Sequence, residues 1–177
     1  MADDNAANKW RPATNLVRGG TNRSNFAETS EGIFMTSGYI YDTAEQAQRA
    51  FQGEEERFIY SRFSNPTVGM FESRMALLEG AATGRATSTG MAAVNAAIAS
   101  SVRSGDRLVA SKALFGSCDY ICRDLMPRYG VQSTMVDGTN LAEWEAALSE
   151  PTAVVFMETP SNPQMDIIDI KAVSELA

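Results

Sequence analysis

The sequence predicts an α/β fold in which helices cover a parallel or mixed β-sheet. From residue 66 onward, short apolar segments alternate with amphipathic ones, as in repeated β-α units. Several of the amphipathic segments also begin at a residue that caps helices well. With 177 residues, 44% of them hydrophobic and 21% charged, the chain can bury the core of one globular domain.

The first regular element is a helix predicted over residues 66–79. Asn65 is a good N-cap, and Pro66 suits the first helical turn because that position needs no backbone N–H donor. Gly80 stands where a left-handed residue commonly ends a helix. A short buried strand is then expected at residues 85–88, before a helix from about Gly90 to Val102.

The alternation continues to the end of the chain. Asn140 and Glu143 form a capping pair for one of the later helices, and the last apolar run reads as a fully buried strand. We expect strands at 106–111, 131–136 and 152–158, and helices at 117–130, 140–150 and 169–177.

Residues 1–65 look different, because they are polar, contain glycines and show little periodicity. The exception is a short helix after residue 42, for which Asp42 and Glu45 are a plausible capping pair. We expect residues 1–65 to form an arm that lies on a neighbouring subunit, since a long ordered arm gains little in solvent. The chain ends inside an amphipathic pattern, so residues 66–177 are expected to be the first part of a longer α/β domain.

Composition excludes several classes of protein. The net charge is −7, from 15 Lys and Arg against 22 Asp and Glu, which disfavours binding to a nucleic-acid backbone or an anionic membrane. The polar, acidic N-terminus and the absence of a long apolar run predict a soluble cytoplasmic protein. The sequence has no histidine, which rules out Ser-His-Asp and Cys-His nucleophiles within it. Cys118 and Cys122 are expected to be buried, reduced thiols, and no metal site is predicted.

The segment from Ser88 to Gly90 carries the first hint of function. A strand that ends in hydroxyl residues and runs through Gly90 into a helix of small residues would present free backbone N–H groups and the positive end of a helix dipole. Such a turn can bind phosphate or carboxylate. The alternative is that the small residues serve only helix packing. The sequence has no P-loop lysine and no G-x-G-x-x-G pattern.

Two further groups strengthen the anion-binding hypothesis. Tyr60 and Arg62 are two apart, so on an extended segment both side chains would point the same way and could hold one phosphate. The alternative is a surface arginine beside a core tyrosine. After the last strand, two prolines are expected to project Asn162 over the same sheet edge as Gly90, where its amide could donate to a ring oxygen. The alternative there is a plain Asn-Pro turn.

Four motifs, in their order and spacing, resemble the pyridoxal-phosphate enzymes of Cys/Met metabolism, the family of cystathionine γ-synthase and methionine γ-lyase. They are YSRFSNPT, STGMAA, LFG and ETPSNP, and the resemblance covers nearly the whole chain. Within the family, residues 13–47 are most similar to the O-succinylhomoserine sulfhydrylases, with the O-acetylhomoserine sulfhydrylases next.

This resemblance implies the N-terminal portion of the large domain of a fold-type-I, aspartate-aminotransferase-like enzyme, which works as a homotetramer with active sites shared between subunits. The implied cofactor is pyridoxal 5'-phosphate. Its phosphate would accept bonds from the backbone of Gly90 and Met91, while Tyr60 and Arg62 would bind the phosphate in the neighbouring subunit. Phe115 would stack on the cofactor ring, and Asn162 would contact the phenolic oxygen.

Phe115 departs from the LYG pattern of many relatives, in which a tyrosine hydroxyl is assigned to proton transfer near the γ leaving group. A phenyl ring can stack but cannot donate a proton. Because succinate leaves as a stable anion, the departure favours an acylated homoserine over a γ-lyase substrate. The mechanism that the resemblance implies is γ-replacement, in which sulfide and O-succinylhomoserine give homocysteine for methionine biosynthesis. The alternatives within the family are an O-acetylhomoserine sulfhydrylase, a cystathionine γ-synthase and a methionine γ-lyase.

The resemblance also implies a lysine that binds the cofactor through a Schiff base, in a Ser-x-Thr-Lys context. The lysines present, Lys9, Lys112 and Lys171, do not match it. We therefore expect that lysine, the carboxylate that pairs with the pyridinium nitrogen and the substrate-binding arginine to lie beyond Ala177, and the chain alone not to catalyse the reaction. Alternatives from other classes are a non-catalytic phosphate-binding module and a purely structural α/β module.

Overall fold

The structure of the chain, a computed structural model, describes residues 10–177 in two compact units that divide between Ala86 and Thr87. Lys9 and the start of the expected arm lie outside the described residues.

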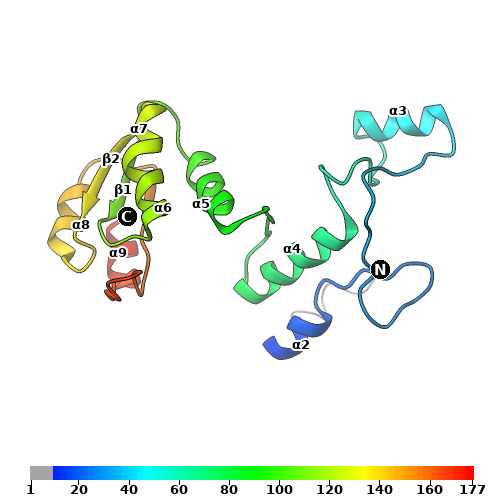
Figure 1. Ribbon diagram of the computed structural model, residues 1–177, viewed down its shortest axis with the longest axis horizontal. Coiled ribbons are helices and arrows are strands. Elements are labelled where there is room, and N and C mark those ends of the chain that lie inside the picture. The colour runs from blue at the N-terminus through cyan, green and yellow to red at the C-terminus, as the bar shows by residue number, and fades with distance from the viewer. Residues whose placement is uncertain (1–9) are drawn as a thin grey trace. The chain divides into compact units, whose positions relative to one another are not determined.

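The first unit is irregular over much of its length, as expected, and its helices are α2 (Pro12–Arg18), α3 (Ala44–Gln52) and α4 (Pro66–Glu79) (Figure 1). Helix α2 was not predicted, although Pro12 in its first turn and Gly19 just past its end are ordinary helix signals. The predicted cap of α3 is wrong by one residue. The Thr43 hydroxyl accepts from the N–H of Gln46 at 3.1 Å, because a threonine in this position reaches the third helical amide.

Helix α4 confirms the prediction made for it. The Asn65 side chain accepts from the N–H of Thr67 at 2.9 Å, and Gly80 ends the helix in the left-handed conformation, with φ of 62°. The expected strand at residues 85–88, in contrast, is wrong. In the described part of the chain no strand pairs with this segment, and a strand cannot form without a neighbour for its backbone groups.

The second unit contains a parallel sheet in the order β2-β1-β3, with strands β1 (Arg107–Ser111), β2 (Gln132–Val136) and β3 (Val154–Phe156). The predicted alternation of strands and helices is confirmed for all three strands. The connecting helical elements are α5 (Gly90–Ala99), α6 (Gly116–Tyr120), the π-helical η1 (Ile121–Leu125), α7 (Met126–Arg128), α8 (Leu141–Leu148) and α9 (Ile170–Leu176).

The sheet is covered on both faces, because successive residues of a strand point to opposite sides. Leu108 and Ala110 of β1 face a cluster that includes Ile98 of α5 and Cys122 of η1. Val109, the residue between them, packs in a second cluster with residues of α8 and α9. Helices α5 to α7 therefore lie on one face, and α8 and α9 on the other (Figure 1).

The predicted helix over 117–130 is present but contains a π-helical turn, which was not predicted. Pro127 has no N–H to donate, and its ring would crowd the carbonyl four residues earlier. The N–H of Met126, just before it, bonds to the carbonyl of Ile121, five residues back. The wider turn makes room for the proline inside a continuous helical segment.

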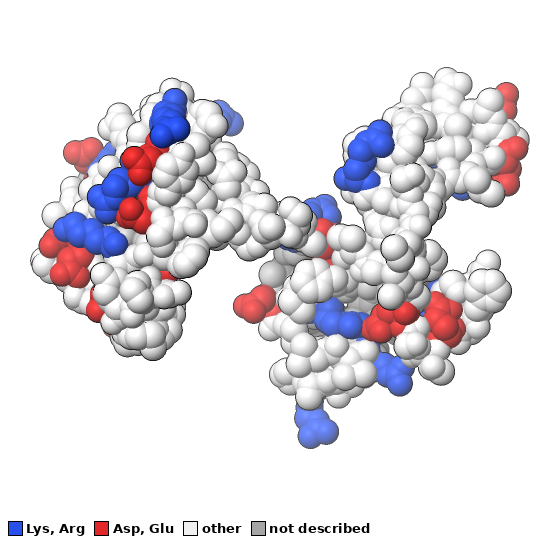
Figure 2. Space-filling model, in the orientation of Figure 1, with Lys and Arg blue, Asp and Glu red and all other residues white. Residues whose placement is uncertain are grey.

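Strand β3 is shorter and less buried than predicted. It comprises Val154 to Phe156, and each of these residues is half-buried, because β3 pairs with β1 on one side and lies at the edge of the sheet. Among residues 10–177, no helix has the length and apolar character needed to cross a membrane. On the visible face of the second unit, basic and acidic side chains are interspersed (Figure 2).

Candidate functional site

The start of α5 forms an amide cradle in the second unit. The Thr89 hydroxyl accepts from the N–H of Ala92 at 3.0 Å, and the Thr89 carbonyl accepts from Ala93 at 3.1 Å. In the described residues, the N–H groups of Gly90 and Met91 have no such acceptor. A Cβ atom built on Gly90 would meet nothing within 4 Å, so the cradle is open to a ligand.

The sheet topology predicts a binding crevice beside β1, at the carboxyl ends of β1 and β3. The chain leaves β1 for β2 on one side and later returns to β3 on the other, with the connecting helices on opposite faces. Ligands of open α/β sheets bind at the carboxyl ends of strands where the order reverses in this way. The residues that follow β1 and β3, Phe115 and Glu158 to Asn162, lie at this edge.

Phe115 is the N-cap residue of α6, and its side chain is 46% exposed. Its N–H donates to Oε2 of Glu158 at 2.9 Å, which ties the segment after β1 to the segment after β3. The sequence reasoning did not single out Glu158. The only local signal was an acidic residue directly after an apolar strand, because its partner is 43 positions away in the chain.

Asn162 is exposed, and it lies on a loop whose neighbouring residues form several hydrogen bonds. The buried Ser161 hydroxyl accepts from the N–H of Asp166 at 2.9 Å, and the Ser161 N–H donates to the Asp166 carbonyl at 3.0 Å. The Thr159 hydroxyl accepts from Ile168 at 2.9 Å. The loop therefore leaves the Asn162 amide free to meet a ligand, with its backbone already ordered.

Both cysteines are free and buried, as predicted. Burial, followed by a hydrogen bond to Glu158 and the charge of that carboxylate, raises the pKa of Cys118 to about 11. Burial also raises the pKa of Cys122 to about 12, with smaller contributions from nearby Cys118 and acidic residues. These thiols stay protonated at neutral pH and are poor nucleophiles.

Tyr60 and Arg62 belong to the first unit, and they do come together. The segment was expected to be extended, but residues 61–63 form a turn in which the N–H of Phe63 bonds to the Tyr60 carbonyl at 2.9 Å. The turn places the Arg62 guanidinium 4.0 Å from the Tyr60 ring centroid, a cation-π contact. Arg62 is exposed and therefore remains available to an anion.

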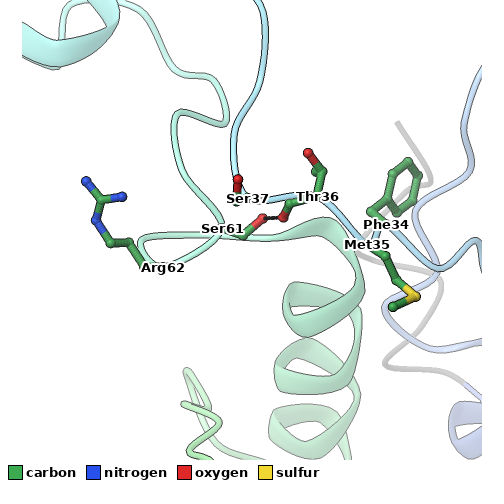
Figure 3. A pocket seen from close by; sticks show the side chains of 6 residues that line it. All are labelled: Phe34, Met35, Thr36, Ser37, Ser61 and Arg62. Carbon is green, nitrogen blue, oxygen red and sulfur yellow. Dashed lines mark hydrogen bonds between the residues drawn. The ribbon is translucent and has the colours of Figure 1, made fainter.

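An open pocket of about 490 Å³ adjoins Arg62. Its remaining walls come from residues 34–37 and Ser61, whose hydroxyl donates to the Thr36 carbonyl (Figure 3). Asn65 joins two residues that line this pocket, because its Nδ2 donates to the Phe34 carbonyl and to the Ser61 hydroxyl, each at 2.9 Å. In Figure 3 Arg62 stands at the opposite end of the pocket from Phe34.

The fold and the comparisons define a class of protein, the fold-type-I pyridoxal-phosphate-dependent enzymes. The sequence profile of the Cys/Met metabolism PLP-dependent enzymes matches residues 13–177, so the chain belongs to that family. Pyridoxal phosphate is the family's cofactor, and the open cradle, the exposed ring of Phe115 and the free amide of Asn162 fit it.

Curated relatives span more than one activity. The chain is 52% identical over 165 residues to an O-succinylhomoserine sulfhydrylase of Mycobacterium tuberculosis, covering 93% of this chain and 41% of that protein. It is 40% identical to an L-methionine γ-lyase of Porphyromonas gingivalis, with the same coverage. The chain thus spans about two fifths of the length of these relatives.

Solved structures agree on the fold. A cystathionine γ-lyase from Micromonospora echinospora matches with a TM-score of 0.81 at 31% identity, over 95% of this chain and 42% of that one. A Campylobacter jejuni protein assigned as an O-acetylhomoserine (thiol)-lyase matches with a TM-score of 0.87 at 29% identity, over 96% and 42%. The latter contains a pyridoxyl-lysine monophosphate, a covalent adduct of the cofactor with a lysine.

Proposed function

We propose that the chain is the N-terminal part of a sulfhydrylase that replaces the succinyl group of O-succinylhomoserine with sulfide to form homocysteine. The observation that carries the proposal is Phe115, whose exposed ring offers no hydroxyl at the crevice. The 52% identity to the mycobacterial O-succinylhomoserine sulfhydrylase supports the same choice.

The described residues would bind and orient the cofactor. The amides of Gly90 and Met91, at the positive end of α5, would hold its phosphate. Phe115 would cover one face of the ring, and the Asn162 amide would donate to the ring's phenolic oxygen. When bound, pyridoxal phosphate supplies the electron sink that makes loss of protons from Cα and Cβ possible.

The leaving group decides between the candidate substrates. In the proposed reaction the Cγ–O bond breaks, succinate departs with the electron pair, and sulfide forms the new Cγ–S bond. Succinate is a stable anion and needs no proton from the side chain at position 115. A thiolate that leaves from methionine would benefit from an acid, which a phenyl ring cannot supply.

The assembly is also part of the proposal. Large apolar side chains in the segment between α2 and α4 are strongly exposed, including Phe26 at 92% and Met35 at 94%. Exposed apolar surface of this kind is typical of subunit contacts. We propose that residues 1–65 lie against a neighbouring subunit of a cytoplasmic homotetramer, where Tyr60 and Arg62 complete the neighbour's phosphate site.

Steady-state kinetics on the purified full-length protein test the substrate. We expect kcat/KM for O-succinylhomoserine with sulfide to exceed kcat/KM for methionine cleavage. Phe115→Tyr is the matched variant, and it should raise methionine cleavage relative to succinyl replacement, by roughly tenfold or more if the new hydroxyl acts as an acid. A wild-type protein that cleaves methionine faster than it uses O-succinylhomoserine would contradict the assignment.

Methionine γ-lyase remains a second candidate, because the chain is 36–40% identical to five curated L-methionine γ-lyases, over at least 145 residues in each case. The same kinetics separate it from the sulfhydrylase. A full-length protein that bound no pyridoxal phosphate would instead favour a structural or phosphate-binding module.

A further inference from the structure

We propose that Glu158 is a positioning residue for the cofactor site, which sets the place of the Phe115 ring by holding the start of α6 against the end of β3. The inference rests on the proposed stacking role of Phe115 and extends it to a residue that touches no cofactor itself.

The first support is how Phe115 is held. Among residues 10–177, no side chain caps the start of α6, so the backbone must be fixed in another way. The Phe115 carbonyl accepts from the N–H of Cys118 at 2.8 Å and of Asp119 at 2.9 Å, and its own N–H donates to Glu158 at 2.9 Å. With both backbone groups engaged, the ring can turn about its side-chain bonds, but its Cα stays in place.

The second support is the surroundings of the same helical turn. Burial, followed by the nearby Glu158 carboxylate, raises the pKa of Cys118 to about 11, and only 5% of the surface of Cys118 is exposed. The Glu158 carboxylate therefore lies close to the first turn of α6. Charge-assisted hydrogen bonds are stronger and better defined than neutral ones, so the bond from the Phe115 N–H to this carboxylate can fix a distance between two segments.

The third support is the position of Glu158 in the chain. It lies directly before the loop that Thr159 and Ser161 order, and this loop carries Asn162. The Glu158 carboxylate thus links the proposed ring-stacking residue to the proposed amide donor across the crevice between β1 and β3. Because its carboxylate accepts from the backbone N–H of Phe115, we assign Glu158 a positioning role and no proton transfer.

A double-mutant cycle on the full-length protein tests the inference, with the dissociation constant and visible circular dichroism of bound pyridoxal phosphate as readouts. We expect Glu158→Ala to weaken cofactor binding by about tenfold, the scale of one hydrogen bond to a charged group. Glu158→Gln keeps a carbonyl oxygen for the Phe115 N–H and should restore most of the affinity and the dichroism. In Phe115→Ala, the further change Glu158→Ala should have little effect, because the ring it positions is gone.

Glu143 provides a matched control, since its Oε2 accepts from the N–H of Asp137 at 2.7 Å and from the Lys112 ammonium at 3.3 Å, and bonds to neither α6 nor the loop that carries Asn162. Glu143→Ala should lower thermal stability but leave cofactor affinity unchanged. Equal losses of affinity in Glu143→Ala and Glu158→Ala would indicate general loosening and overturn the inference. Independent, multiplicative effects of the Glu158 and Phe115 changes would also overturn it.

Two further points keep the test decisive. If Glu158→Ala does not fold, Glu158→Asp replaces it, because a side chain one methylene shorter keeps the charge but withdraws it from the Phe115 N–H. Cofactor binding is measured without turnover. A protein that binds pyridoxal phosphate but does not use O-succinylhomoserine would therefore contradict the proposed function while the role of Glu158 is still measured.

Discussion

At the scale of single residues, the candidate site consists of groups left free by the fold. The amides of Gly90 and Met91 have no acceptor in the described residues, and the Asn162 side chain is exposed above an ordered loop. Neighbouring side chains already have partners: Thr89 caps α5, and Glu158 accepts from the N–H of Phe115. Each free group can thus be tested by a change that leaves the surrounding contacts intact.

Gly90→Ala should affect the ligand and spare the fold. The new methyl group meets no atom within 4 Å in the part of the chain that the structure describes, so we expect the free energy of unfolding without cofactor to stay within about 0.5 kcal/mol of wild type. The methyl would crowd a phosphate bound at the cradle, so the dissociation constant of pyridoxal phosphate should rise. Thermal unfolding and cofactor titration of the full-length protein measure the two effects. Unchanged cofactor affinity would argue against phosphate binding at this turn.

The buried thiols predict a loss of stability in alkaline solution. The ordinary pKa of a thiol is 9.0, while that of Cys118 is raised to about 11 and that of Cys122 to about 12. Above pH 9 the unfolded chain releases these protons before the folded one does, so stability should fall as pH rises toward 12. Urea unfolding across this range, with Cys118→Ala and Cys122→Ala variants, should show a smaller alkaline loss when either thiol is removed.

At the scale of helices and strands, side-chain caps decide where most helices begin. Thr43, Asn65, Thr89, Asn140 and Asp169 each accept from an N–H in the first turn of the helix that follows. Asn65 does more than cap, because its amide nitrogen also bonds to the segment that lines the pocket. Helix α4 and the pocket wall are therefore stabilised by one side chain.

Asn65→Ala should destabilise the protein by about 1–3 kcal/mol, since it removes a cap and the bonds that Nδ2 donates to Phe34, Ser61 and Tyr39 in a buried site. Asn65→Asp keeps the cap to Thr67 but loses the donor to the Phe34 carbonyl, so its loss should be smaller. Chemical unfolding of the full-length variants gives both values. Equal losses in the two variants would mean that the cap contributes little.

At the scale of the whole molecule, we propose that the site is completed by residues of a neighbouring subunit. Tyr60 and Arg62 form a tight pair in the first unit, and the cradle and crevice belong to the second. The exposed apolar side chains of the first unit fit a contact with a neighbour. Sharing of sites between subunits can be tested with mixed oligomers.

Mixed oligomers of two inactive variants test this sharing. Arg62→Ala removes the guanidinium that would reach the neighbouring site, and Gly90→Val blocks the cradle of its own subunit. If sites are shared, unfolding and refolding the two variants together should restore about a quarter of wild-type activity, because one site of each mixed pair is intact. Activity in the mixture that does not exceed the separate variants would mean that each subunit completes its own site.

The sequence by itself was sufficient to predict the alternation of strands and helices, the caps of α4 and α8, the buried thiols and the family. These features follow from neighbours within a few residues, or from motifs read along the chain. The tertiary structure alone showed that residues 85–88 form no strand and that β3 is half-buried, because both depend on which strands lie alongside. The contact between Glu158 and Phe115 was also visible only in the tertiary structure. Partners 43 residues apart leave no periodic trace in the sequence, and only the parallel pairing of β1 with β3 brings them together.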